Sequence, residues 1–253
     1  MNITAVIITQ NEERNIGRCL TSLQGVADEI VVVDSGSTDA TESICREAGV
    51  RFEHHDWEGY SAQKNYATGL ATCDWILSID ADEALSEELR ASLTQLKQSD
   101  PDASNIYNFN RLANYCGHWI RHCGWYPDPC IRLWHVGTAQ WDGMIHEELL
   151  YAPSVKLVHL EGDLLHYSYY SVADHVQRMA RYAPMGAEKA YLQGKRCGPA
   201  SMVFRPMWTF LRDYFLKGGF LDGSAGFVIC RLSAVYTLVK YATLYNRTHE
   251  GSR

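Results

Sequence analysis

The segment WILSIDAD, residues Trp75 to Asp82, is an apolar run that ends in two carboxylates. A short, continuous apolar run of this kind is typical of a strand that is buried inside a sheet. Asp80 and Asp82 follow at the carboxyl end of that strand, separated by a single alanine. The segment therefore predicts a buried strand that presents paired carboxylates at its end.

Three similar units precede this segment, and one helix follows it. Each unit pairs a short apolar strand with a helix-period segment, which predicts an α/β fold. Right-handed crossovers make such a pattern a mainly parallel or mixed sheet sandwiched by helices, with ligands bound beyond the carboxyl ends of the strands. The expected strands are Ala5–Thr9, Glu29–Asp34, Val50–His54 and Trp75–Asp80, and the expected helices are Arg14–Leu23, Thr38–Glu47, Tyr60–Leu70 and Glu87–Leu96.

Polar clusters follow three of these strands. They are residues 9–12, residues 34–39 and residues 80–83. We expect them to face one crevice, because the carboxyl ends of parallel strands meet at the same edge of a sheet. Ser37 or Thr38 is expected to cap the second helix, and Ser86 the fourth.

Beyond residue 104 the pattern changes. Shorter strands are expected at Asn105–Arg111, Cys130–Trp134 and Asp163–Tyr167, and the sequence becomes helical after residue 171. We therefore expect an α/β domain over residues 1–170 and a helical C-terminal extension over residues 171–253.

The net charge of −7 is unevenly distributed, since residues 195–253 contain 9 Lys and Arg but only 3 Asp and Glu. The acidic remainder argues against a nucleic-acid partner, whose phosphates require a basic face. Asn2 leads directly into an apolar strand and not into a secretory signal, which favours a cytoplasmic protein. The eight cysteines are expected to be reduced. A zinc site among residues 116–135 is the weaker alternative, because no C-x2-C pair supports it.

The carboxylates suggest a metal site. Asp80 and Asp82 are suited to Mg²⁺ or Mn²⁺, which prefer oxygen ligands and share them with substrate phosphates. Asp34 is suited to a base N–H or a ribose hydroxyl, whereas Asp39 is expected to be structural. Asn11 and Glu12 either begin a helix or line a base pocket, and the residues alone leave both interpretations open.

The combination of residues 6–13, 32–39 and 78–83, at these separations, resembles the family-2 glycosyltransferases with a GT-A fold. Further motifs resemble the branch of lipopolysaccharide inner-core glucosyltransferases; these are residues 63–65, 124–128, 132–134, 146–149 and 166–169. Thr9, Asp80 and Arg132 are candidate donor-binding residues. The resemblance implies that residues 1–170 form a nucleotide-sugar-binding and catalytic domain, with a UDP-sugar donor whose uridine part contacts Asn11, Glu12, Asp34 and Lys64. It also implies that Asp82 holds the metal and that Asp80 contacts ribose or metal.

An inverting transfer requires a base that removes a proton from the acceptor hydroxyl. Glu147 is the candidate and Glu148 its rival, because helix periodicity does not say which of two neighbours points inward. By the same resemblance, His166 would be a further metal ligand, although a buried structural histidine is the alternative. His146 is expected to orient Glu147.

Aromatic and basic side chains between residues 119 and 132 are candidates for contacts with a sugar acceptor. Aromatic faces suit the apolar sides of sugar rings, although core packing explains such residues equally well. The candidates are Trp119, Trp125, Tyr126, Arg121, His122 and Arg132.

The C-terminal region is basic and aromatic. Residues 201–217 place Phe204, Met207, Trp208, Leu211 and Phe215 on one helical face. A second apolar stretch, residues 225–244, is interrupted by Arg231 and Lys240. These helices are suited to lying on an anionic inner membrane, and completion of the fold or a dimer contact is the alternative.

The resemblance implies an inverting hexosyltransferase that moves glucose from UDP-glucose onto a lipopolysaccharide inner-core heptose by metal-dependent single displacement. One alternative is a related enzyme that acts on another cell-surface glycan. A second is a sugar nucleotidyltransferase, but the acidic turn after the first strand lacks the basic glycine-rich loop of that class. A nucleotide-sugar-binding protein without activity is the non-enzyme alternative.

Overall fold

The computed structural model describes residues 1–143 and 148–249, which form two compact units. The sheet unit comprises Met1–Arg111 and Asp128–Tyr167. The helical unit comprises Leu112–Pro127 and Ser168–Arg253. Compared with the expected boundary at residue 170, the structure adds residues 112–127 to the helical unit.

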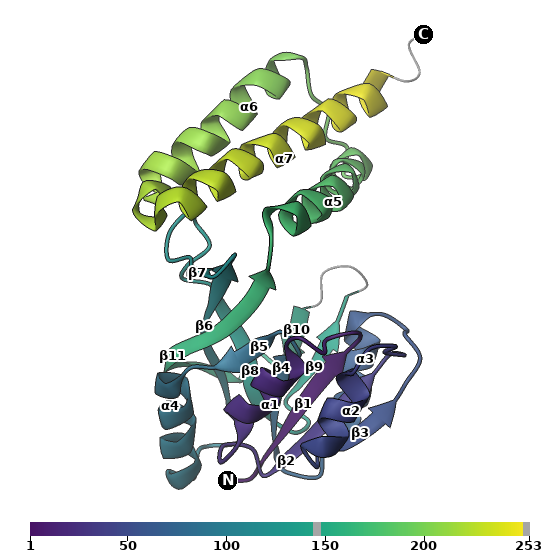
Figure 1. Ribbon diagram of the computed structural model, residues 1–253, viewed down its shortest axis with the longest axis vertical. Coiled ribbons are helices and arrows are strands. Elements are labelled where there is room, and N and C mark those ends of the chain that lie inside the picture. The colour runs from purple at the N-terminus through teal and green to yellow at the C-terminus, as the bar shows by residue number, and fades with distance from the viewer. Residues whose placement is uncertain (144–147, 250–253) are drawn as a thin grey trace. The chain divides into compact units, whose positions relative to one another are not determined.

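The sheet unit is built on a large mixed sheet (Figure 1). Four of its strands are parallel, in the order β3-β2-β1-β4: they are β1 (Ile3–Thr9), β2 (Glu29–Asp34), β3 (Arg51–His54) and β4 (Trp75–Asp80). Beyond β4 the order continues β8-β6-β11-β5, where β8 (Pro129–His135) is antiparallel to both β4 and β6 (Asn105–Tyr115). The edge strand β5 (Glu83–Leu85) is antiparallel to β11 (Lys156–Tyr169). The expected mixed α/β sheet is confirmed.

Two hydrophobic cores lie on the two faces of this sheet. Alternate side chains of β1 belong to different cores: Ile3, Ala5 and Ile7 to one, and Val6 to the other. The first core includes side chains of α1 (Ile16–Leu23), α2 (Thr41–Glu47) and α4 (Glu87–Gln98). The second includes Ala67 of α3 (Tyr60–Gly69) and Trp141 of β9 (Ala139–Asp142), which pairs with β10 (Glu148–Tyr151). Helices therefore cover both faces, as the alternating pattern predicts.

The start of α2 differs from the expected one, because a polar side chain accepts a backbone N–H at that point. The helix α2 begins at Thr41 and not at Thr38, and Asp39 accepts the N–H of Thr41 at 3.0 Å. The expected capping by Ser37 or Thr38 is therefore wrong. The expected cap of α4 is confirmed, because Ser86 accepts the N–H of Leu89 at 3.2 Å.

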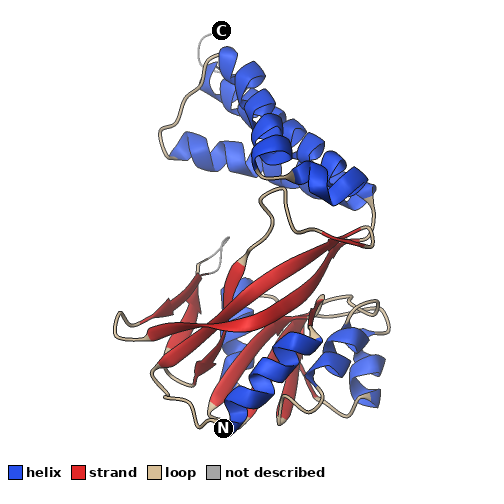
Figure 2. Ribbon diagram, turned by 90° about the vertical axis from the view of Figure 1, so that its left-hand side faces the viewer, coloured by secondary structure: helices blue, strands red, loops and turns tan. Residues whose placement is uncertain are grey.

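The helical unit is built from long helices, which Figure 2 draws in blue. They are α5 (Val172–Leu192), α6 (Ala200–Leu211) and α7 (Gly223–His249). A π-helical turn, η1 (Arg212–Leu216), and a 3-10 turn, η2 (Gly219–Asp222), join α6 to α7. The short strand β7 (His118–Trp119) pairs with the end of β6. The predicted helical character after residue 171 is confirmed.

One helical stretch in the described part of the chain, Gly219–His249, is long and apolar enough to cross a membrane by length and composition alone. The most apolar 18-residue window of this stretch has a mean hydropathy of 1.3, and 17% of that window is buried. Arg231 and Lys240 lie within this stretch.

Candidate active site

The carboxyl ends of β1, β2 and β4 lie side by side. Thr9 is aligned with Asp34 in the pairing of β1 with β2, and Ile8 is aligned with Asp80 in the pairing of β1 with β4. The predicted alignment of these three strand ends is confirmed, because parallel pairing in this register brings them together.

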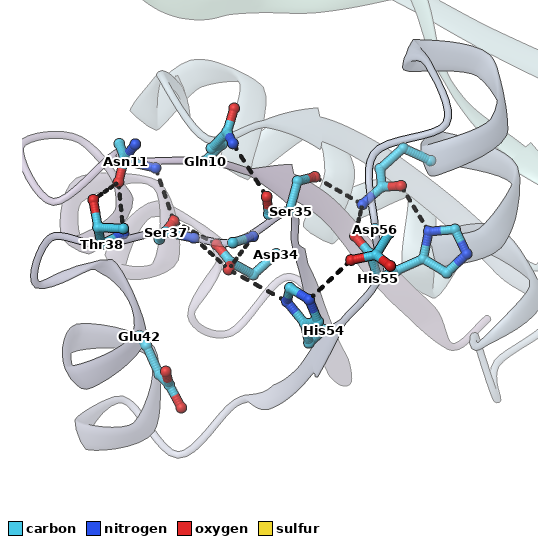
Figure 3. A network of polar contacts seen from close by, with 12 residues as sticks. Gln10, Asn11, Asp34, Ser35, Ser37, Thr38, Glu42, His54, His55 and Asp56 are labelled. Atoms are coloured by element: carbon cyan, nitrogen blue, oxygen red, sulfur yellow. Dashed lines mark hydrogen bonds and ion pairs between the residues drawn. The ribbon is translucent and has the colours of Figure 1, made fainter.

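Asp34 and Asn11 hold two loops against each other (Figure 3). Asp34 Oδ2 accepts the N–H groups of Gly36 at 2.9 Å and Ser37 at 2.8 Å. Asn11 has a φ of 55°, and its side-chain oxygen accepts the N–H of Thr38 at 2.8 Å. Ser37 Oγ accepts the N–H of Asn11 at 2.8 Å. These bonds fix the shape of the loops, and a contact with uridine stays a prediction for both residues.

Glu12 and Thr9 lie in the first of these loops. The backbone N–H of Glu12 donates to Thr41 Oγ1 at 2.8 Å, and Glu12 Oε2 accepts from Asn15 Nδ2 at 2.7 Å. Glu12 therefore supports the start of α1, which is one of the two interpretations left open by the sequence. Thr9 Oγ1 is buried and makes no hydrogen bond within the described residues.

Asp80 is held between two cations at the end of β4. Lys64 Nζ lies 3.1 Å from Asp80 Oδ1, and Arg132 Nη2 lies 2.9 Å from Asp80 Oδ2. Lys64 extends from α3 and Arg132 from β8, and both are buried. Lys64 Nζ also lies 4.6 Å from the centre of the Trp141 ring. Three of the predicted donor-binding residues are therefore brought into one cluster.

Glu83 is a member of this cluster to which the sequence assigned no role. It is 1% exposed, its Oε1 lies 2.7 Å from Arg132 Nη2, and its Oε2 accepts the N–H of Asp80 at 2.9 Å. Arg111 Nη1 lies 3.9 Å from the same carboxylate. The position of Glu83 directly after the Asp80–Asp82 motif was the available signal. Its burial and its arginine partners were not evident without the fold.

The charges of the cluster change the proton affinities of its members. Burial opposes ionisation of Asp80, but the charges of Arg132 and Lys64 hold the pKa of Asp80 well below its ordinary value. Burial raises the pKa of Glu83, and the charge of Asp80 adds to the effect, although Arg132 acts against both. Arg132 remains protonated, because the two carboxylates outweigh its burial and raise its pKa. Asp80 is therefore an anion whose two oxygens both face cations.

Asp82 and His166 form a second polar pair. His166 Nε2 lies 3.1 Å from Asp82 Oδ2, and both side chains are about one-fifth exposed. Burial alone would lower the pKa of His166, but the hydrogen bond to Asp82 and the charges of Asp82 and Glu83 raise it. β11 carries His166 to this position, where it is aligned with Glu83 of β5. The structure thus brings together two of the three predicted metal ligands.

Asp82 and His166 are the side chains that fit the predicted metal site. The described residues contain no group of three or more His, Cys, Asp or Glu side chains placed to hold a metal ion. Asp82 and His166 supply two ligand atoms, and Mg²⁺ or Mn²⁺ commonly completes its shell with substrate phosphates and water. These two residues fit such an ion, whereas a metal contact of Asp80 stays a prediction.

The predicted base lies outside the described residues, as does His146. The structure describes residues 1–143 and 148–249, so Glu147 is not among them. Its rival Glu148 is the first residue of β10, where it is exposed and aligned with Asp142 of β9. The choice between Glu147 and Glu148 stays a prediction.

The acceptor candidates between residues 119 and 126 belong to the helical unit. Trp125 packs against Tyr115, Tyr169 and His175, with ring centres 5.7 to 6.1 Å apart. His122 Nδ1 lies 2.8 Å from Asp222 Oδ1, and Arg121 lies over Tyr126. Trp119 is 37% exposed. Packing explains Trp125, and contacts of the other side chains with an acceptor stay predictions.

Comparison with known protein families identifies the family of this chain. Residues 4–141 match the family described as Glycosyl transferase family 2. The chain belongs to glycosyl transferase family 2. The matched range contains Asp34, Lys64, Asp80, Asp82 and Arg132, and the GT-A resemblance stated from the sequence motifs is confirmed at the level of the family.

Two relatives match this glycosyltransferase over nearly its whole length. An uncharacterized glycosyltransferase of Rickettsia typhi is 31% identical over 96% of this chain and 86% of its own. The lipopolysaccharide core biosynthesis glycosyltransferase LpsC of Rhizobium meliloti is 31% identical over 97% of this chain and 92% of its own. The second relative agrees with the lipopolysaccharide branch indicated by the motifs.

Solved structures show weaker likeness to this glycosyltransferase. S. aureus TarS in complex with UDP aligns with 99% of this chain and 92% of its own at 16% identity, with a TM-score of 0.44. Glucosyl-3-phosphoglycerate synthase of Mycobacterium tuberculosis, in complex with Mn²⁺, UDP and glucosyl-3-phosphoglycerate, aligns with 45% of this chain and 44% of its own at 24% identity, with a TM-score of 0.35. The fold assignment therefore rests on the strand order and on the family.

Proposed function

We propose that this glycosyltransferase moves glucose from UDP-glucose onto a heptose of the lipopolysaccharide inner core. The observation that carries the proposal is the cluster at the end of β4, where Asp80 is flanked by Lys64 and Arg132 and Asp82 is paired with His166. The similarity to LpsC over nearly the whole chain supports a lipopolysaccharide core acceptor.

Cationic side chains in the cluster support a diphosphate donor. Lys64 and Arg132 lie on either side of Asp80, and Arg132 Nε and Nη1 make no hydrogen bond within the described residues. Cationic N–H donors are suited to diphosphate oxygens, with which they form short charge-assisted bonds. We infer that Asp80 orients these two cations and contacts the ribose, while Thr9, Asn11, Glu12 and Asp34 surround the uridine.

Asp82 and His166 are the residues that would hold a divalent cation. Mg²⁺ or Mn²⁺ at this position supplies Lewis-acid stabilisation of the charge that develops on the departing diphosphate. The protein residues keep the donor in place, and Asp82 Oδ2 lies 3.1 Å from His166 Nε2. The metal dependence is part of the proposal.

Inversion in a single displacement needs a base on the acceptor side. We infer that Glu147 accepts the proton of the attacking heptose hydroxyl, so that the C–O bond to the sugar forms as the bond to UDP breaks. The products are the glycosylated core and UDP, and the proton remains on the Glu147 carboxyl until it passes to solvent.

The acceptor is lipid-linked in this proposal, which places the protein at the cytoplasmic face of the inner membrane. The exposed aromatic side chains of α6 and the basic residues of the C-terminal region support such peripheral association. An acceptor from another cell-surface glycan is the second candidate, because the family accommodates many acceptors on one fold.

Product formation by the purified protein tests the proposal. The protein would be incubated with UDP-glucose, other UDP-hexoses, GDP-sugars and ADP-sugars, with Mg²⁺, Mn²⁺ or a chelator. Acceptors would be lipopolysaccharide core ending in heptose and the same core without heptose. We expect UDP release that depends on UDP-glucose, on the metal and on the heptose-containing core. Release without any acceptor requirement, or only from a GDP- or ADP-sugar, would contradict the proposal.

A further inference from the structure

A large groove lies within the helical unit. Its volume is about 840 Å³, and side chains of α5, α6 and α7 form its walls. Cations and aromatic rings dominate the lining: Arg178, Arg205, Arg212, Lys240, Tyr182, Phe204, Trp208, Tyr236 and Tyr241. Because every lining residue belongs to the helical unit, the groove is separate from the cluster around Asp80.

Three of the four cations in the groove have no carboxylate partner in the described part of the chain. Arg212 pairs with Asp213, with N–O distances of 2.8 and 3.0 Å, and Asp213 is the only acidic residue of the lining. Arg178 lies over the ring of Tyr169, 4.9 Å from its centre. Arg205 lies over Tyr241 and donates to its hydroxyl at 3.0 Å. Aromatic faces thus support Arg178 and Arg205, and their charges are not neutralised.

An apolar stripe borders this charged groove. The helix α6 has no buried residue, although its sequence is largely apolar. Phe204 and Trp208, which line the groove, are 61% and 55% exposed. The stripe continues along α6 and η1 through Val203, Met207, Leu211, Phe215 and Leu216, all of which are exposed. Exposed apolar surface of this extent, next to polar residues, marks an interaction site.

We propose that this groove binds the phosphate of an anionic membrane lipid, and that the acyl chains of the lipid lie along the apolar stripe of α6. Guanidinium groups match the geometry of phosphate oxygens, and basic residues beside an apolar helix face are suited to an anionic bilayer surface. The inference concerns only the helical unit and does not depend on which sugar donor or acceptor the enzyme uses.

Charge decides between a membrane and a second copy of the chain. Residues 195–253 contain 9 basic and 3 acidic residues, so two copies joined through this face would bring like charges together. An anionic lipid neutralises the same charges and covers the apolar stripe. A soluble acidic protein would match the charge, but the length of the exposed aliphatic and aromatic stripe favours acyl chains.

Lipid binding by matched charge variants tests this assignment. In the groove variant, Arg178→Gln, Arg205→Gln and Lys240→Gln are combined. The control variant combines Arg181→Gln, Lys189→Gln and Lys195→Gln, which removes the same charge from exposed residues outside the groove. Co-sedimentation with phosphatidylglycerol vesicles and with phosphatidylcholine vesicles would be measured for all three proteins. Circular dichroism melting would establish that each variant is folded.

We expect the wild type to bind phosphatidylglycerol vesicles and not phosphatidylcholine vesicles. The groove variant should lose about a hundredfold in affinity, because each cation near an anionic surface contributes about a fivefold factor. The control variant should lose less than about tenfold in affinity. Equal losses in the two variants would overturn the assignment, since they would indicate general surface charge. Equal binding to both lipids would also overturn it.

A second measurement separates a lipid from free phosphate and also tests the apolar stripe. Native mass spectrometry would record complexes with dioctanoyl-phosphatidylglycerol in the presence of excess inorganic phosphate. We expect the lipid to remain bound to the wild type and to be lost from Phe204→Ser/Trp208→Ser. Displacement by inorganic phosphate, or full retention by the double serine variant, would contradict the proposed acyl-chain contacts. Formation of a dimer that excludes the lipid would favour the second copy instead.

Discussion

Arg132 Nη2 lies 2.9 Å from Asp80 Oδ2 and 2.7 Å from Glu83 Oε1. The arginine therefore joins Asp80 of the Asp80–Asp82 pair to the buried carboxylate of Glu83, to which the sequence assigned no role. Arg132 and Glu83 are 4% and 1% exposed. The pair has consequences for stability as well as for the site.

Arg132→Leu should destabilise the protein by about 3–5 kcal/mol, because it leaves the buried charge of Glu83 poorly compensated. Arg132→Leu/Glu83→Leu should recover much of that loss, since it removes both charges. Arg51→Gln is a matched control: its pair with Glu53 is exposed and should contribute less than about 1 kcal/mol. Urea denaturation measures all three, and a cost for Arg132→Leu as small as that of Arg51→Gln would show that the buried pair is not important for stability.

Asp82→Asn should remove the effect of divalent cations on UDP binding, because it takes away the carboxylate that faces His166. Isothermal titration with UDP, with and without Mn²⁺, measures this difference. Asp80→Asn should weaken UDP binding with or without metal, since it releases Lys64 and Arg132 from their present positions. Glu161→Gln, an exposed change in the same strand as His166, is the control. A metal effect that persists in Asp82→Asn would contradict the assignment.

Glu147→Gln should lower turnover by about 10²–10⁴, the usual contribution of a positioned base, while UDP binding stays close to that of the wild type. Glu148→Gln serves as the neighbouring control, because Glu148 is exposed at the start of β10. Turnover with saturating donor and acceptor measures the difference. If Glu148→Gln loses activity and Glu147→Gln does not, the two roles must be exchanged.

Asp34→Asn and Asp39→Asn separate a donor contact from a purely structural role. Each carboxylate accepts two backbone N–H bonds, so each change should cost about 1–2 kcal/mol in the free energy of unfolding. Only Asp34→Asn should also weaken UDP binding, by about tenfold or more. Thermal melting with and without UDP reports both effects, and equal loss of UDP stabilisation in the two variants would argue for a structural role of Asp34.

Gly162→Ala should cost about 3 kcal/mol or more, because two penalties coincide at this position. Gly162 has a φ of +101°, and an added Cβ would lie 2.3 Å from the backbone nitrogen of Leu89 at the start of α4. Gly137→Ala is the control: its φ is +79°, but no heavy atom lies within 4 Å of the added carbon. Its cost should be about 1–2 kcal/mol. If the two variants unfold at similar urea concentrations, the close contact between β11 and α4 contributes little to the free energy of unfolding.

The sequence by itself determined the alternation of strands and helices in residues 1–98, because hydrophobic period and short polar turns act locally. It also located the carboxyl-end clusters and the Ser86 cap, since parallel pairing and capping follow from neighbouring residues. The motifs in residues 6–13, 32–39 and 78–83 were sufficient to indicate the family. The sequence did not determine the start of α2. Asp39 accepts the N–H of Thr41, and the helix begins at Thr41 and not at Thr38.

Only the tertiary structure decided the partners of the site residues. Arg132 reaches Asp80 and Glu83 across 52 and 49 positions of sequence, a distance over which no periodic pattern carries information. The resemblance assigned Lys64 to the donor, but only the fold shows that Lys64 is buried against Trp141 and Asp80. The groove between α5, α6 and α7 likewise depends on packing of segments separated along the chain. Ion pairs and grooves are products of long-range contacts, and such contacts exist only once the chain has folded.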